Sequence, residues 1–243
     1  MQRTFVIGDI HGADEAFRQV LDRASFDRHS DRLICLGDVC DRRPGVRQCI
    51  DELLKIKHLV MIKGNHDLWA LEWMMRGGDP GSVSEAWYMQ GGSDTIDSYR
   101  DGIPESHVEL LRSAKYYHVE NSRMFVHGGF DHRYPVEKQD PNDLVWDRSL
   151  VHAAAKCKDP TTRLGNYLEI FVGHTPTINF IRKVPGMSDH IFKERKSVAG
   201  SVLDYPLKLC NVWLMDTGAG WSGGRLSMMN PDTGTVVRSD VLK

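Results

Sequence analysis

The feature that most constrains the fold is a unit that occurs three times near the start of the chain: a short apolar run, a Gly-Asp or Gly-Asn pair, and a helical pattern. The units begin with RTFVIGDIHG, RLICLGDVCDR and HLVMIKGNHD, and their helical patterns cover about residues 13–24, 45–56 and 68–75. Apolar runs that alternate with helical periodicity predict parallel strands joined by right-handed crossovers. Because parallel strands end at one edge of a sheet, the polar pairs are expected to meet there.

The rest of the chain predicts a second sheet. Residues 77–113 are richer in glycine and are expected to form a loop-and-helix cap beside the site. Strand patterns then return as KYYHVE, SRMFVHGG, YLEIFVGHT, NVWLMDTG, RLSMMN and TVVRSD. Their closeness in sequence favours antiparallel pairs and hence a second, mixed sheet. Residues 183–205 have weak periodicity and are interpreted as an irregular excursion, and without an obvious linker the chain is predicted to form one domain, residues 1–243.

Composition narrows the function classes. Of the 243 residues, 26% are charged and 41% hydrophobic, with a net charge of −2, so neither a nucleic-acid polymer nor a membrane is expected as a partner. No signal peptide or apolar run long enough to span a bilayer is recognised, which predicts a cytoplasmic protein. The number of cysteines is odd and none form C-x-x-C, so neither a disulfide framework nor a thiolate zinc site is expected from Cys35, Cys40, Cys49, Cys157 and Cys210.

Polar side chains follow six of the predicted strands, namely Asp9 and His11, Asp38 and Asp41, Asn65 and His66, His127, His174, and Asp216. Any one of these residues is more often part of a turn than a ligand. Together, carboxylates, imidazoles and an amide without thiolates suit Mn²⁺, Fe or Zn²⁺. Two such ions about 3.5–4 Å apart can hold a hydroxide whose pKa is lowered toward about 7. Arg42 and Arg148 are the candidates to meet the charge of a phosphate, because guanidinium grips two phosphate oxygens at once.

Five of these segments resemble the ordered motifs of calcineurin-like metallophosphoesterases: GDIHG (8–12), GDVCDR (37–42), GNHD (64–67), HGG (127–129) and GHT (173–175). The set is most similar to the bacterial and phage branch of the phosphoprotein phosphatases, as are VWDR (145–148) and DTG (216–218). The resemblance extends over nearly the whole chain. It implies an α/β fold, a four-layer α-β-β-α sandwich of two mixed sheets, with a dinuclear metal site at the carboxyl-terminal edge of the strands.

The resemblance also implies residue roles. The metal ligands would be Asp9 and His11 on the first ion, Asp38 bridging both, and Asn65, His127 and His174 on the second. His66 would be the general acid for the leaving alcohol, oriented by Asp41, while Arg42, Arg148 and Asn65 would contact the phosphate. An imidazole near its unperturbed pKa suits proton donation near neutral pH. Asp67 is interpreted as a helix cap or as support for the ligands, and manganese is the expected metal, with iron or zinc as alternatives.

The sequence departs from the resembled family at Arg43, which stands where the family has glycine. A loop arginine that points into solvent is the favoured interpretation. The alternative is extra positive charge at the mouth of the site, which would favour a polyphosphate or an acidic phosphopeptide. Cys40, between Asp38 and Asp41, is interpreted as a small buried apolar side chain rather than a redox sensor.

Three functions are compared. The leading hypothesis is a serine/threonine protein phosphatase, with phosphotyrosine as a further substrate class, in which a metal-bridging hydroxide attacks a phosphorylated protein or peptide without a phosphoenzyme. The alternative is a symmetrical dinucleoside tetraphosphate hydrolase; such enzymes share most of the motifs but often lack the acid-orienting aspartate, so Asp41 favours the phosphatase. The third, an inactive phosphate-binding scaffold, predicts a missing ligand, and none is missing. The oligomeric state is not indicated.

Overall fold

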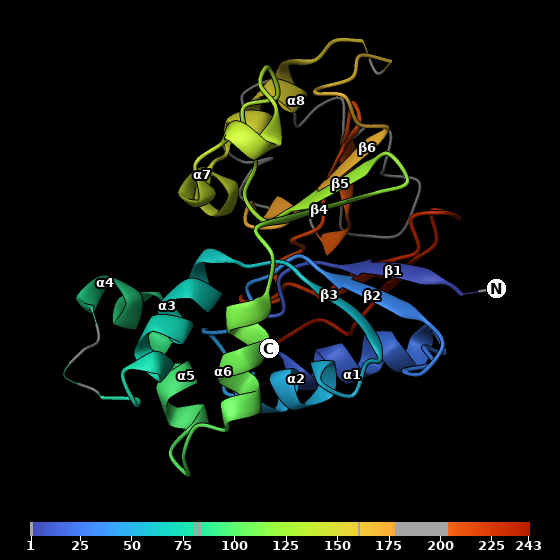
Figure 1. Ribbon diagram of the computed structural model, residues 1–243. Helices are drawn as coiled ribbons and strands as arrows, with labels where there is room; N and C mark the ends of the chain where they lie inside the picture. The colour runs from blue at the N-terminus through green and yellow to red at the C-terminus, as the bar shows by residue number, and fades with distance from the viewer. Residues whose placement is uncertain (1, 80, 82–83, 160, 178–203) are drawn as a thin grey trace.

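Two five-stranded β-sheets face each other, and helices cover their outer faces (Figure 1). The structure is a computed structural model that describes residues 2–79, 81, 84–159, 161–177 and 204–243. The predicted α/β sandwich of two mixed sheets is confirmed. No helix within those described ranges is long and apolar enough to cross a membrane. That the whole chain is one domain stays a prediction.

The first sheet contains the three units that open the sequence. Its strands are, from edge to edge, β10 (Val236–Arg238), β9 (Ser227–Met229), β1 (Thr4–Ile7), β2 (Arg32–Cys35) and β3 (His58–Met61). The three N-terminal strands are parallel, as predicted. The hairpin of β9 and β10 was expected in the second sheet but pairs antiparallel to β1. That expectation was wrong because alternation predicts a hairpin without indicating which sheet edge accepts it.

The second sheet is mixed. Its strands are β4 (Tyr117–Glu120), β5 (Arg123–Val126), β6 (Glu169–Val172), β8 (Val212–Leu214) and β7 (Leu207–Leu209). The outer pairs β4–β5 and β7–β8 are antiparallel, whereas β5, β6 and β8 run parallel. The sequence analysis missed β7, which follows the segment interpreted as an irregular excursion. Most of that segment, residues 183–203, lies outside the described residues.

The helices are α1 (Asp14–Arg23), α2 (Val46–Leu53), α3 (Asn65–Met75), α4 (Glu85–Trp87), the π-helical turn η2 (Tyr88–Gly92), α5 (Ser93–Ser98), α6 (Glu105–Ser113), the 3₁₀ turn η3 (Val136–Lys138), α7 (Pro141–Trp146) and α8 (Ser149–Lys156). The cap expected within residues 77–113 is present as α4 to α6. Helix α3 begins at Asn65 rather than at Leu68 as the pattern predicted, because the Asp67 carboxylate accepts the Gly64 N–H and closes the first turn.

Buried side chains form three layers, as four stacked layers of secondary structure require. One layer packs α1, α2, α3 and α6 against the first sheet, and another packs α7 and α8 against the second (Figure 1). The layer between the sheets consists of Val6, Ile34, Leu36, Val60, Ile62, Phe125, Phe171, Met215 and Met229. Since successive strand residues point to opposite faces, each sheet contributes alternate residues to this middle layer.

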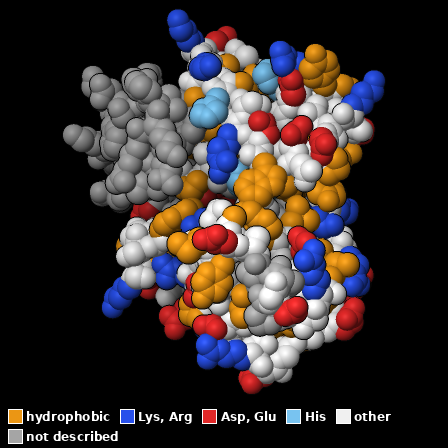
Figure 2. Space-filling view, turned by 90° about the vertical axis from the view of Figure 1, so that its left-hand side faces the viewer, with side chains coloured by type: hydrophobic (Ala, Val, Ile, Leu, Met, Phe, Trp, Pro, Cys, Tyr) orange, Lys and Arg blue, Asp and Glu red, His pale blue; other side chains and the backbone are white. Residues whose placement is uncertain are grey.

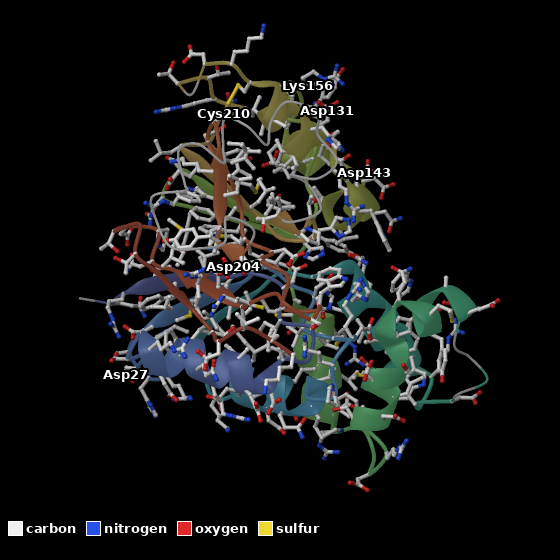
Figure 3. All side chains as sticks on the ribbon, turned by 180° about the vertical axis from the view of Figure 1, so that it is seen from behind. Asp27, Asp131, Asp143, Lys156, Asp204 and Cys210 are labelled. Atoms are coloured by element: carbon white, nitrogen blue, oxygen red, sulfur yellow. A yellow bond between two sulfur atoms is a disulfide. The ribbon has the colours of Figure 1, made fainter. Side chains whose placement is uncertain are left out.

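One disulfide contradicts the expectation that the cysteines are unpaired. Cys157, which follows α8, is bonded to Cys210 in the turn between β7 and β8, where Figure 3 shows the sulfur–sulfur bond. The two cysteines are 53 residues apart in sequence, so their pairing depends on the packing of α8 on this hairpin. The other cysteines are buried and free, and burial raises the pKa of the Cys40 thiol well above its usual range. Cys40 therefore matches the interpretation as a buried apolar side chain.

The middle layer provides a test of the sandwich. Phe171 is fully buried between the sheets, and its ring stacks on Phe125 with centroids 5.2 Å apart. Phe171→Ala is expected to lower the free energy of unfolding by about 3–5 kcal/mol, because it removes a large side chain and leaves a cavity. Urea unfolding followed by circular dichroism measures the loss. Val119→Ala, at a side chain that is 42% exposed, is the control and should change stability by less than about 0.5 kcal/mol.

Candidate dinuclear metal site

The predicted ligands lie where the carboxyl ends of strands from both sheets meet. Asp9 and His11 follow β1, Asp38 follows β2, Asn65 begins α3 after β3, His127 follows β5 and His174 follows β6. All six are buried, and all except His127 line one pocket of about 260 Å³. The structure therefore brings together every residue that the sequence analysis selected as a ligand.

Asp38 occupies the centre of this cluster. One carboxylate oxygen is 3.7 Å from His11 Nε2, and the other is 3.3 Å from His127 Nε2. Two groups of ligand atoms close enough to share an ion both include Asp38: one with His11 and His66, the other with His127 and His174. A carboxylate with one oxygen toward each group has the arrangement that a bridging ligand needs.

The histidines have the orientation that metal binding requires, and burial favours their neutral form, although the Asp38 carboxylate raises the pKa of His127 above its usual value. His11 Nδ1 donates to the Cys40 carbonyl and His127 Nδ1 to the Leu36 carbonyl, both at 2.8 Å, because a carbonyl can only accept. In a neutral ring this leaves Nε2 free to bind a metal. Burial lowers the pKa of His11 to about 3 and that of His174 to about 2. His174 Nε2 is buried with no partner among the described residues, as expected of a ligand atom.

The carboxylates place negative charge in the same buried space. Burial, together with the charges of Asp216 and Asp38, raises the pKa of Asp9 well above its usual value. Burial opposes ionisation of Asp38 too, but the nearby histidines hold its pKa well below the usual range. Burial raises the pKa of Asp216 to about 6, and one of its oxygens has no partner within the described part of the chain. Buried carboxylates are stable only when positive charge or hydrogen bonds compensate them. The donor set of the site fits two divalent ions that would supply this charge.

Asp67 supports the ligand loop through its carboxylate. It accepts backbone N–H groups of Asp38, Val39 and Cys40 at 2.8, 2.8 and 3.2 Å, and that of Gly64 at 3.0 Å. The two interpretations of Asp67, as a helix cap and as support for the ligands, are both correct. Glycine is required at position 64, because a Cβ there would lie 2.1 Å from a carboxylate oxygen of Asp38.

Backbone strain is concentrated at the site. His11, Asp38, Asp41, Arg42 and His174 all have positive φ angles, between 49° and 73°. Non-glycine residues adopt this left-handed conformation rarely, at an energetic cost that the surrounding structure must offset. Four of these side chains line the pocket, and the fifth, Asp41, is bonded to His66, so the strain is concentrated as is typical of a functional site.

His66 and Asp41 form a buried pair. His66 Nδ1 donates to the Asp41 carboxylate at 2.6 Å, so Nε2 is the atom left to face the pocket. Asp41 also accepts the Trp87 indole N–H at 2.8 Å and the Thr95 hydroxyl at 2.6 Å. Sequence analysis did not identify Trp87 or Thr95, although both belong to the glycine-rich cap expected beside the site. Their bonds fix Asp41, which in turn fixes the ring of His66.

Arg42 and Arg148 both line the pocket. The Arg42 guanidinium lies over the ring of Trp221 at 4.4 Å, and one of its nitrogens is 3.4 Å from His66 Nε2. Arg148 precedes α8, and its burial lowers the pKa of its guanidinium, against the opposing effect of the site carboxylates. Basic, histidine and hydrophobic side chains, the kinds that line the pocket, lie side by side near the middle of the face in Figure 2.

Several pocket residues were not predicted. Trp146 lies in the VWDR motif, yet only Arg148 was selected from it, and Trp221 and Gln90 belong to glycine-containing loops without a ligand pattern. His152 belongs to none of the motifs but also lines the pocket. His152 could have been predicted from its spacing, because it lies one helical turn after Arg148 and therefore on the same side of α8.

Arg43 follows neither of its two interpretations. Its Nε–H donates to the Ala219 carbonyl at 2.6 Å, and a terminal nitrogen donates to the backbone oxygen of Lys243 at 3.2 Å. The side chain is thus engaged in holding two C-terminal segments. It neither points freely into solvent nor adds charge to the pocket lining.

The two-sheet sandwich carries a buried cluster of carboxylate, imidazole and amide side chains whose donor atoms suit divalent metal ions. The model of the calcineurin-like phosphoesterase family matches residues 2–203, and the chain belongs to that family. The resemblance noted in the sequence is therefore confirmed. This family uses divalent metals; the role of each residue in holding them stays a prediction.

Relatives of more than one activity are similar to the chain. The symmetrical bis(5'-nucleosyl)-tetraphosphatase of Methylobacillus flagellatus is 31% identical over 137 residues, which are 56% of this chain and 46% of that protein. Serine/threonine-protein phosphatase 1 of Salmonella typhimurium is 33% identical over 87 residues, 32% of this chain and 40% of that protein. The chain spans about half the length of the curated relatives it matches.

Among solved structures, a putative diadenosine tetraphosphatase superimposes with a TM-score of 0.65 at 17% identity, covering 98% of this chain and 92% of that one. At this identity the likeness supports the fold alone. It shows that the arrangement of both sheets is shared with that structure.

The support given by Asp67 leads to a prediction. Asp67→Asn replaces one acceptor oxygen with an amide that cannot accept, so the loop carrying Asp38 loses part of its anchor. We expect metal affinity to fall about 10- to 100-fold, as is typical when support of a ligand is removed. Titration of metal-stripped protein with Mn²⁺ measures the change. Asp27→Asn, at the surface position labelled in Figure 3, is the control; an equal loss there would contradict the proposed role.

Proposed function

We propose that the chain cleaves dinucleoside tetraphosphates symmetrically into two nucleoside diphosphates. The observation that carries this proposal is the pocket, which places two arginines, Arg42 and Arg148, beside two tryptophans, Trp146 and Trp221. Guanidinium groups suit a chain of phosphates, and flat indole rings suit nucleosides. The curated relative named above that carries this activity supports the proposal, although the chain spans only part of it.

The site residues divide the chemistry among them. Asp9, His11, Asp38, Asn65, His127 and His174 would hold two divalent ions, for which we propose manganese, with iron or zinc compatible with the same donors. When bound, these ions polarise phosphate oxygens and make water a stronger nucleophile. Arg42 and Arg148 would orient the phosphate. As water oxygen bonds to phosphorus and the bond to the leaving oxygen breaks, His66 Nε2 would give that oxygen a proton.

A second candidate, a phosphoserine or phosphothreonine protein phosphatase, is favoured by the contact of His66 with Asp41 at 2.6 Å. The leaving oxygen of an alkyl phosphate is far more basic than that of a nucleoside diphosphate, so it depends more on a positioned acid. The partner in this case would be a phosphorylated protein or peptide. The similarity to the Salmonella phosphatase covers a third of this chain and agrees with this candidate.

A panel of substrates separates the candidates. Metal-stripped protein given Mn²⁺ is offered diadenosine tetraphosphate and peptides with phosphoserine, phosphothreonine or phosphotyrosine. We expect kcat/KM to be at least about tenfold higher for the dinucleotide, with ADP as the product, because only that substrate engages both arginines and the tryptophans. A preference for the peptides would establish the second candidate. Bound metal with no hydrolysis of any of these substrates would revive the inactive scaffold.

Removal of the acid provides a second prediction. His66→Asn should lower kcat about 10²- to 10⁴-fold for phosphoserine, whose leaving group needs a proton. For p-nitrophenyl phosphate, whose leaving group is weakly basic, the loss should be less than about tenfold. Metal content is measured in parallel, since His66 lies within reach of the group formed by His11 and Asp38. A variant that no longer holds metal would show that His66 is a ligand and not the acid.

A further inference from the structure

Arg42 has a constrained backbone and a side chain that lines the pocket. Its backbone is in the left-handed region, with φ at 73°, and its N–H donates to the Gly91 carbonyl at 3.1 Å. Its Nε is buried and has no hydrogen-bond partner among the described residues. The guanidinium is held within the protein by one long hydrogen bond, from a terminal nitrogen to His66 Nε2 at 3.4 Å, so other contacts must help to direct it toward the phosphate.

Trp221 provides the closest such contact. Its ring lies 4.4 Å from the centre of the Arg42 guanidinium, within the range of a cation–π interaction. The loop before it packs on the same side chain, since a Cβ on Gly220 would lie 2.5 Å from Arg42 Cδ. Trp221 also meets His11 edge-on at 5.9 Å. The loop is thus pressed against both Arg42 and a predicted metal ligand.

Arg43 connects this loop to the chain segment that carries Arg42. Its Nε–H donates at 2.6 Å to the carbonyl of Ala219, two residues before Trp221, and a terminal nitrogen donates to the backbone oxygen of Lys243. Consecutive arginines therefore have different surroundings: Arg42 lies on the ring of Trp221, and Arg43 holds the backbone that presents this ring.

We propose that Trp221 and Arg43 are positioning residues for phosphate binding. Trp221 stacks on Arg42 and aims its guanidinium into the pocket, while Arg43 holds the Ala219–Trp221 loop in place. The inference rests on the proposed function only in that Arg42 contacts the substrate phosphate, and it applies equally to nucleotides and phosphopeptides. A long arginine side chain without this stack samples many rotamers, so fewer molecules present the guanidinium to the phosphate.

The first test compares Trp221→Leu with Trp221→Phe in the Mn²⁺-loaded protein. The leucine variant should raise the inhibition constant of orthophosphate and the KM for p-nitrophenyl phosphate roughly 5- to 30-fold, the range that a partly desolvated cation–π contact implies. Metal content and kcat should change by less than about twofold. The phenylalanine variant keeps a ring beneath Arg42 and should recover most of the affinity. A purely structural role would predict similar losses for both variants.

A double-mutant cycle separates positioning from direct contact with substrate. If Trp221 acts through Arg42, Arg42→Ala should abolish the effect of Trp221→Leu, so that the double variant binds orthophosphate like Arg42→Ala alone. Fully additive losses would overturn the proposal, because they would mean that Trp221 acts independently of Arg42. An orthophosphate inhibition constant of Trp221→Leu equal to that of the unsubstituted protein would also overturn it.

Arg43 is tested against a matched arginine. Arg47 also donates to a backbone carbonyl, that of Gly102 at 3.1 Å, and lies over the ring of Tyr99, but it does not line the pocket. Arg43→Met should weaken orthophosphate binding about 3- to 10-fold, whereas Arg47→Met should leave it unchanged. Arg43→Lys, which can still donate to one carbonyl, should give an intermediate value. Equal effects of the two methionine variants would contradict a specific role of Arg43.

Calorimetric titration of orthophosphate into each metal-loaded variant measures phosphate binding without hydrolysis. It therefore tests the roles of Trp221 and Arg43 separately from the proposed function. Absence of hydrolysis in the unsubstituted protein would refute the proposed function, while the calorimetry would still measure the contribution of Trp221. Thermal unfolding is recorded for every variant. Weaker orthophosphate binding with an unchanged midpoint of thermal unfolding supports a positioning role. Weaker binding found only in variants whose unfolding midpoint is also lowered contradicts it.

Discussion

Burial of negative charge is the constraint on which the rest of this structure depends. Asp9, Asp38 and Asp216 are almost entirely removed from solvent at the edge where the two sheets meet. Isolated buried carboxylates are strongly destabilising, so a chain that keeps them must provide cations or hydrogen bonds. The surrounding imidazoles supply part of this compensation, and divalent ions are the natural source of the remainder. The buried carboxylates that are unfavourable without a metal are thus the same groups that would bind it.

The packing of the two sheets sets the distance between the ligands that come from the first sheet and those that come from the second. Asp9 and Asp38 come from the first sheet, whereas His127 and His174 come from the second. The packing between the sheets, which includes Phe125 stacked on Phe171, holds these groups in register together with hydrogen bonds such as that of His127 Nδ1 to the Leu36 carbonyl. Interiors packed as densely as crystals deform little, so the ligands from the two sheets keep their spacing. The strained backbone at the ligands is maintained by the same rigidity.

The features that could be predicted from the sequence are those determined by neighbouring residues. A strand followed by Gly-Asp or Gly-Asn is a local pattern, and it predicts the parallel strands β1 to β3 with Asp9, Asp38 and Asn65 at one edge. His11, His127 and His174 also lie in short motifs after strands, and the resemblance to the family implied their roles as ligands. The sheet that receives the β9–β10 hairpin, the bond between Cys157 and Cys210, and the contact of Arg43 with Ala219 each join distant segments. No periodicity encodes such pairings, because they depend on how completed elements pack. Trp87 and Thr95 were missed for the same reason, since only tertiary structure brings them to Asp41.

The surroundings of Asp41 also change what its presence means for function. In the sequence, Asp41 favours the protein phosphatase, because symmetrical dinucleoside tetraphosphate hydrolases often lack an aspartate at this position of the motif. In the structure the same carboxylate accepts hydrogen bonds from Trp87 and Thr95 and so attaches the helical cap to the site. A chain that cleaves anhydrides would lose this anchor, together with the residue that orients His66, if Asp41 were replaced. Asp41 thus has a structural reason to be present under either candidate function, and its value for discriminating between them is smaller than the motif alone implies.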